Sequence, residues 1–174
     1  MVTERRRIPI AGPGPRATTA ERLGGYIYGT IVVLAVVVAG ARAYPHEAGH
    51  IAWLSLATAV VFWLAHVYAD AVAHSVARNE HLTFAELRRI ARREAAIIEA
   101  AVPPLVPLVL GAIGVLSTKT AVWIAFVLGL IVLATQGVVV ARVERLGLLG
   151  TLAVVAGNVS LGVLLVGLKL AVSH

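Results

Sequence analysis

The chain has 174 residues, of which 59% are hydrophobic and 14% charged, and its mean hydropathy is +0.89. A soluble domain carries about a quarter of its residues as charged side chains, so this composition excludes an ordinary soluble protein and indicates a bilayer protein. The absence of cysteine excludes disulfides, thiolate metal sites and cysteine nucleophiles. The formal charge of +6 is typical of basic loops in a membrane protein, so no nucleic-acid partner is expected.

The N-terminal residues 1–22 are predicted to be a disordered basic tail. Three consecutive arginines at positions 5 to 7 precede a run of prolines and glycines between positions 9 and 15. Such a composition cannot build a packed element. Anionic lipid head groups are the expected contact of this tail.

Five apolar runs come next along the chain, and each has the roughly 20 residues that a helix needs to cross a bilayer. The fold class is therefore predicted to be all-α, a polytopic bundle of five transmembrane helices occupying residues 23–174. The predicted spans are residues 23–41, 51–75, 95–116, 121–141 and 147–170.

The distribution of basic residues predicts the orientation of these spans. Of the 15 lysines and arginines, all but Arg42, Lys119 and Lys169 fall on the side of the N-terminus. The positive-inside rule therefore predicts a multi-pass protein of the plasma membrane with a cytoplasmic N-terminus and an external C-terminus. A competing interpretation takes the first run as a secretory signal cleaved near residues 41–43, but the run is longer than the usual signal core.

A short amphipathic helix is predicted between the second and third spans. Thr83 and Glu86 have the spacing of a capping box, and apolar residues then recur with helical periodicity from Phe84 into the third span. Its polar face carries four arginines, for which phosphate groups of lipids are favoured over a specific binding site. The lipid head-group residues are Arg88, Arg89, Arg92 and Arg93.

Ionisable side chains inside the spans are the strongest functional signal, because each costs about 2.5–3.5 kcal/mol at a helix centre. His66, Asp70 and His74 are four residues apart and so share one face of the second span. At a rise of about 1.5 Å per residue, Tyr28, Asp70, Glu99 and Gln136 fall in one layer near the cytoplasmic surface. The predicted ion or proton site consists of Tyr28, His66, Asp70, His74, Glu94, Glu99, Gln136 and Asn158.

Two interpretations of these residues remain open at this point. Asp70 and Glu99 could share a proton or hold a cation, with His66 and Asn158 forming a second layer near the midplane. Alternatively, the polar side chains hold the helices together. Three prolines from Pro103 to Pro107 predict a kink that would free backbone carbonyls beside Glu99.

Two further motifs bear on partners and cofactors. Gly25 and Gly29 form a G-x-x-x-G pattern that allows close helix packing, within one chain or in a homo-oligomer, for which a dimer is favoured. His46, Glu47 and His50 fit H-E-x-x-H, which on a helix can bind a divalent metal ion such as zinc. The motif lies at an exposed helix start, which favours a solvated helix end over a weak outer metal site or a metalloprotease.

The layout resembles that of the vacuolar iron transporter family. Residues 28–32 have the shape of that family's opening motif, and a proline-rich third span precedes two glycine-dotted ones. Residues 62–69 also resemble a stretch of small, uncharacterised actinobacterial five-span membrane proteins, a likeness that covers residue 50 to the end and implies no activity. The iron ligands do not carry over, since Tyr28 stands where that family has an aspartate and Met1 is the only methionine.

These observations lead to two main functional hypotheses. The first is a small oligomeric transporter or channel that moves a cation or proton past the buried His, Asp and Glu side chains. The second is a non-transporting membrane scaffold or accessory subunit whose polar residues stabilise the bundle. An intramembrane metalloenzyme is a minor alternative, so the chain is not expected to be an enzyme.

Overall fold

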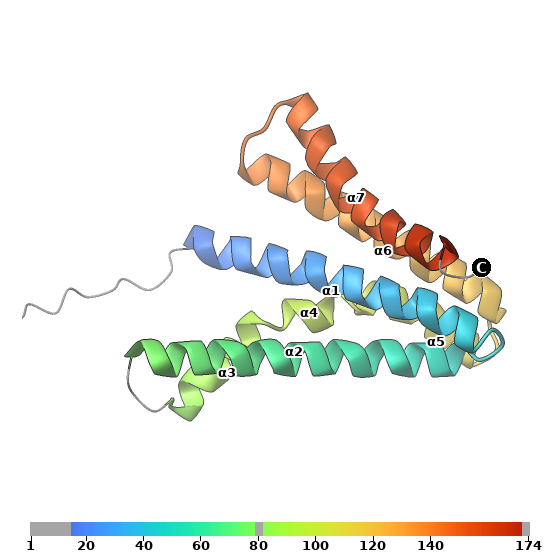
Figure 1. The fold of residues 1–174 in the computed structure, drawn as a ribbon, viewed down its shortest axis with the longest axis horizontal. Helices are drawn as coiled ribbons and strands as arrows, with labels where there is room; N and C mark the ends of the chain where they lie inside the picture. The colour runs from blue at the N-terminus through green and yellow to red at the C-terminus, as the bar shows by residue number, and fades with distance from the viewer. Residues whose placement is uncertain (1–14, 79–81, 172–174) are drawn as a thin grey trace, which may run out of the picture.

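The computed structural model describes residues 15–78 and 82–171, and these residues form helices joined by short loops (Figure 1). The predicted all-α class is confirmed. The helices are α1 (Pro15–Ala43), α2 (Ala48–Arg78), α3 (Phe84–Arg93), α4 (Ala96–Glu99), α5 (Val102–Ala112), α6 (Thr118–Val143) and α7 (Leu148–Ala171).

The structure shows three to four candidate membrane spans among the described residues, where the sequence predicted five. The segments Glu21–Ala43, Ala48–Ala77 and Thr118–Val143 are each long and apolar enough to cross a bilayer. A fourth span results if the bent pair Phe84–Glu99 and Val102–Ala112 crosses as one unit. The apolar part of α7, Leu148–Leu164, is shorter than these candidate spans and is not counted among them. The chain is thus a multi-pass membrane protein by the length and composition of its helices.

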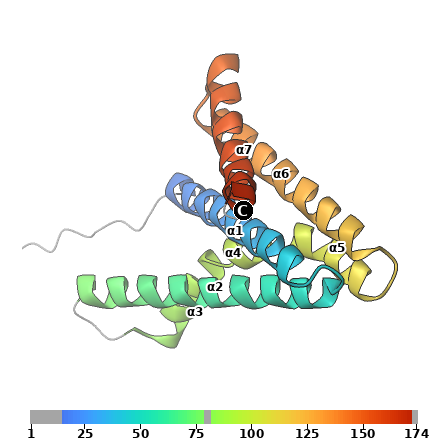
Figure 2. The ribbon, with the colours of Figure 1, turned by 45° about the vertical axis from the view of Figure 1, so that its right-hand side comes forward.

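The helices form a bundle in which α1 and α2 run antiparallel, with α4 packed against both (Figure 1). Helix α5 packs on α2 and α6, and α7 packs on α6 and α1. Toward its connecting loop, the α6–α7 hairpin diverges from α2, as the two views show (Figures 1 and 2). Helix α1 begins at Pro15, inside the range predicted as a tail, while residues 1–14 lie outside the described part.

The break in the third predicted span is confirmed. The axes of its two halves differ by 56°. Pro103 and Pro104 occupy the first turn of α5, where backbone N–H groups have no partner within the helix, so the missing N–H groups of proline cost no hydrogen bond. The ladder continues where the Leu105 N–H donates to the Ala101 carbonyl at 3.1 Å. The chain therefore turns at residues 100–101 and divides the span into α4 and α5.

Small residues allow the helices to approach closely at the centre of the bundle. A Cβ on Gly29 would lie 2.7 Å from the carbonyl oxygen of Ile97, so α1 contacts the backbone of α4 directly. Similarly, a Cβ on Gly129 would lie 2.4 Å from the side chain of Leu34. Leu34 is fully buried, and glycine on α6 provides the space that its side chain fills.

Candidate functional site

A polar pocket of about 420 Å³ opens at the end of the bundle where α1 begins and α2 ends. Three elements supply its lining, and they bring together four of the eight residues predicted for an ion or proton site: Tyr28, His66, Asp70 and Glu94. The remaining lining residues are Glu21, Gly24, Gly25 and Arg93.

Aromatic contacts and one hydrogen bond fix the His66 ring. Its centroid lies 5.3 Å from that of the Tyr28 ring, and Nδ1 lies 2.9 Å from the carbonyl oxygen of Phe62, one turn earlier on α2. Because a carbonyl oxygen can only accept, Nδ1 carries the hydrogen of this bond.

The charges in the pocket are mixed in sign. Arg93, at the end of α3, forms an ion pair with Glu21 of α1. Glu94 is the C-cap residue of α3 and lines the pocket together with Asp70, His66 and Arg93. Sequence reasoning did not find Glu21 and paired Arg93 with lipid instead, because the register of α1 against α3 cannot be read from either helix alone.

Glu99 does not share the pocket with Asp70, although the sequence placed the two in one layer. Its Oε2 accepts from the Arg22 guanidinium at 2.9 Å, on an exposed part of α1. Arg22 follows the pocket residue Glu21 on α1, so Glu99 lies near the level of the pocket but pairs outside it. Glu94 takes the position beside Asp70 that was predicted for Glu99.

The two predicted site residues on α6 and α7 also lie elsewhere. Gln136 has a buried Oε1 that accepts no hydrogen bond within the described residues. Asn158 donates from Nδ2 to the carbonyl of Leu133 at 3.4 Å, which joins α7 to α6. The proposed second layer of His66 and Asn158 is therefore not brought together. Asn158 contributes to helix packing instead.

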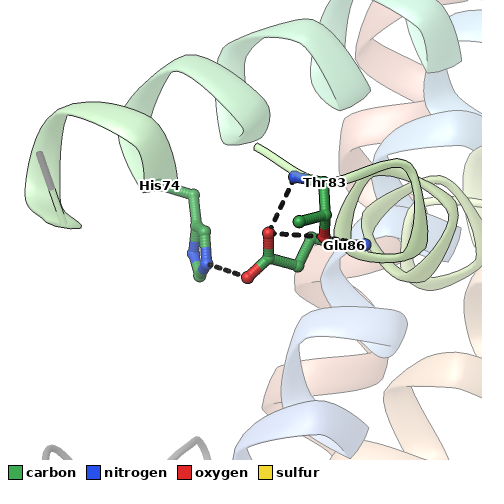
Figure 3. Close-up of polar contacts among 3 residues, drawn as sticks. All are labelled: His74, Thr83 and Glu86. Carbon is green, nitrogen blue, oxygen red and sulfur yellow. Dashed lines mark hydrogen bonds and ion pairs between the residues drawn. The ribbon is translucent and has the colours of Figure 1, made fainter. Parts of the chain in front are cut away.

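His74 belongs to the junction of α2 and α3 rather than to the pocket. Its Nε2 lies 4.0 Å from Oε1 of Glu86, and the other carboxylate oxygen accepts from the backbone N–H of Thr83 at 2.9 Å (Figure 3). The Thr83 hydroxyl in turn accepts from the Glu86 N–H, which confirms the predicted capping box. One carboxylate thus caps α3 and faces α2.

Helix α3 is held to the bundle along its length. The Trp63 indole N–H of α2 donates to the Ala91 carbonyl at 3.0 Å, and Ile90 is buried against Val67 and Ala71. Together with the cap and the Arg93 ion pair, these contacts leave one face of α3 outward. Its exposed arginines are Arg88, Arg89 and Arg92.

The H-E-x-x-H residues do not assemble as two imidazoles on one helical face. Helix α2 begins at Ala48, so His46 and Glu47 precede it, and His46 lies in a turn. Glu47 instead pairs with His50 at 2.6 Å, and the His50 ring stacks on Tyr44 with centroids 4.8 Å apart. Within residues 15–78 and 82–171, no group of three or more His, Asp or Glu side chains is placed to hold a metal ion.

Comparison with known proteins adds no relative to this description. The chain matches no protein-family model, no curated protein and no solved structure. The resemblance to iron transporters thus stays a prediction, and the function is argued from the geometry.

Proposed function

We propose that this chain is a non-transporting membrane scaffold, a helix bundle that spans the bilayer and holds the basic helix α3 at its surface. The observation that carries the proposal is the apolar core that closes the bundle beyond the polar pocket. This core lies between α1, α2, α5 and α6 and comprises Val33, Val37, Ile51, Ala52, Ala59, Ala101, Leu108, Ala121 and Ala125.

The core lies between the pocket and the opposite end of the bundle, with the buried polar side chains Thr30 and Ser55 on the same two helices, α1 and α2. On α1 the pocket ends at Tyr28, and the fully buried Val33 and Val37 come after it. On α2, which runs the other way, His66 is followed toward the opposite end by the buried Ala59 and Ile51. A charge at such a depth costs several kcal/mol when no polar group receives it. This favours a closed pocket over a conducting path within one chain.

The polar side chains near the pocket instead stabilise the position of α3. The ion pair of Glu21 with Arg93 ties α3 to α1, and the bond from Trp63 ties it to α2. Such direct contacts are what a structural role for the polar residues requires. We place α3 on the cytoplasmic side, because the positive-inside rule assigns its arginines there.

Reconstitution into liposomes tests the absence of transport. Proton flux, followed with an enclosed pH-sensitive dye, and potassium flux should equal those of protein-free liposomes. Asp70→Asn and Glu94→Gln should leave these rates unchanged. A flux in the parent protein that Asp70→Asn abolishes would refute the scaffold and support transport through the pocket.

Single cysteines test the orientation, because the parent chain has none. Val115→Cys lies at the end of the bundle opposite α3, and Gly147→Cys lies in the loop between α6 and α7. In intact cells a membrane-impermeant maleimide should label Val115→Cys. Gly147→Cys should react only after permeabilisation, and the reverse pattern would contradict the cytoplasmic placement of α3.

A further inference from the structure

A groove of about 540 Å³ runs between α2 and the N-terminal end of α3. Its walls are mainly apolar, although Ser75 and Thr83 also line it. The apolar lining residues are Tyr68, Ala71, Val72, Leu82, Phe84 and Leu87. Phe84 is 81% exposed and Tyr68 73%, so this chain leaves large apolar side chains uncovered at the groove.

The length of α2 places this groove near the head-group level of a bilayer. Its 31 residues span about 46 Å at 1.5 Å per residue. The hydrocarbon of a bilayer is about 30 Å thick, so the helix extends beyond it. Helix α3 packs on the C-terminal part of α2, where Ile90 contacts Val67 and Ala71. The groove therefore lies where acyl chains meet head groups.

Basic side chains flank the apolar groove along α3. Arg88 follows Phe84 by four residues and Arg92 by eight, so both lie near the Phe84 side of the helix. Both arginines are exposed. The nearest acidic residue on the helix, Glu86, is turned toward His74 of α2 and accepts from Thr83 (Figure 3). Glu86 and Arg88 are two residues apart on the helix, so their side chains do not face each other.

We propose that this groove binds an anionic phospholipid of the bilayer, with an acyl chain between α2 and α3 and the phosphate on Arg88 and Arg92. An arginine near an anionic membrane surface contributes about 1 kcal/mol, and a guanidinium donates well to phosphate oxygens. The apolar groove would bind the acyl chain, which a free head group does not have. The lipid is therefore bound at two places, its phosphate and its acyl chain. The inference rests on the proposed position of α3 at the membrane surface and not on the absence of transport.

Binding of short-chain lipids to the full-length protein in detergent tests the charge. Dioctanoyl phosphatidylglycerol should bind the parent chain, as counted by native mass spectrometry, and dioctanoyl phosphatidylcholine should bind far less. The double variant Arg88→Gln with Arg92→Gln should bind phosphatidylglycerol on the order of thirtyfold more weakly, from about 1 kcal/mol per arginine. The matched control removes two exposed arginines at the C-terminal end of α6, Arg142→Gln with Arg145→Gln, and should bind as the parent does.

A second comparison tests the acyl chain. Val72→Trp places a large ring in the groove at a position that is 44% exposed, so the fold should tolerate it. This variant should no longer bind phosphatidylglycerol. In the parent chain, glycerophosphoglycerol, which has the head group but no acyl chains, should not compete with phosphatidylglycerol for binding. Equal binding of phosphatidylglycerol and phosphatidylcholine to the parent chain would overturn the proposal. So would an equal loss of phosphatidylglycerol binding in the control double variant and in Arg88→Gln with Arg92→Gln. Full competition by inorganic phosphate would also overturn it. The liposome flux assay is independent of these measurements, so the two proposals fail separately.

Discussion

The contact of Gly29 with α4 gives the sharpest test of the fold. In an exposed helix, Gly→Ala stabilises by about 1 kcal/mol. At position 29 the new Cβ would lie 2.7 Å from the carbonyl oxygen of Ile97 and 3.0 Å from its Cα. These are backbone atoms, so no side-chain rotation relieves the overlap, and overpacking of this kind costs about 1–3 kcal/mol. We expect Gly29→Ala to lower the free energy of unfolding.

Gly24→Ala is the matched control, because it lies on the same helix and its Cβ would meet nothing within 4 Å. The two variants should differ by about 2–4 kcal/mol, the overpacking cost plus the lost gain in helix propensity. Unfolding by sodium dodecyl sulfate in mixed micelles, followed by circular dichroism, measures that difference. Equal midpoints for the two variants would show that α1 and α4 do not approach as described.

Three further predictions concern contacts within the bundle. Gly129→Ala should destabilise the protein in the same assay. Adding Leu34→Ala should recover part of the lost stability, because the new Cβ overlaps the Leu34 side chain. If the changes in unfolding free energy of the two single variants simply add in the double variant, the contact would be contradicted. Thr83→Ala should cost about 1 kcal/mol through loss of the α3 cap, whereas Thr83→Ser should retain it. Trp63→Phe removes one hydrogen bond to α3, which contributes about 0.5–1.5 kcal/mol, and should speed hydrogen exchange in residues 84–93; unchanged exchange there would show that the bond does not hold α3.

Local features of the chain could be predicted from the sequence because their causes are local. The Thr83 and Glu86 cap depends on residues three positions apart, and the break before α5 depends on prolines that cannot donate. The all-α class follows from apolar runs, since every backbone polar group in a bilayer must be satisfied within its own segment. The number of spans was less secure. The number depends on whether the bent pair of helices crosses the bilayer as one span, and the length of an apolar run does not tell this.

The candidate site shows where local information ends. The sequence placed His66 and Asp70 on one helical face, and the structure keeps both at the pocket because four-residue spacing fixes them. It paired Asp70 with Glu99, but in the structure Glu94 lines the pocket with Asp70, and Glu99 pairs with Arg22. Which carboxylate meets which helix depends on the offset between neighbouring helices. The packing of small residues against backbone sets that offset, and no single segment of the chain specifies it.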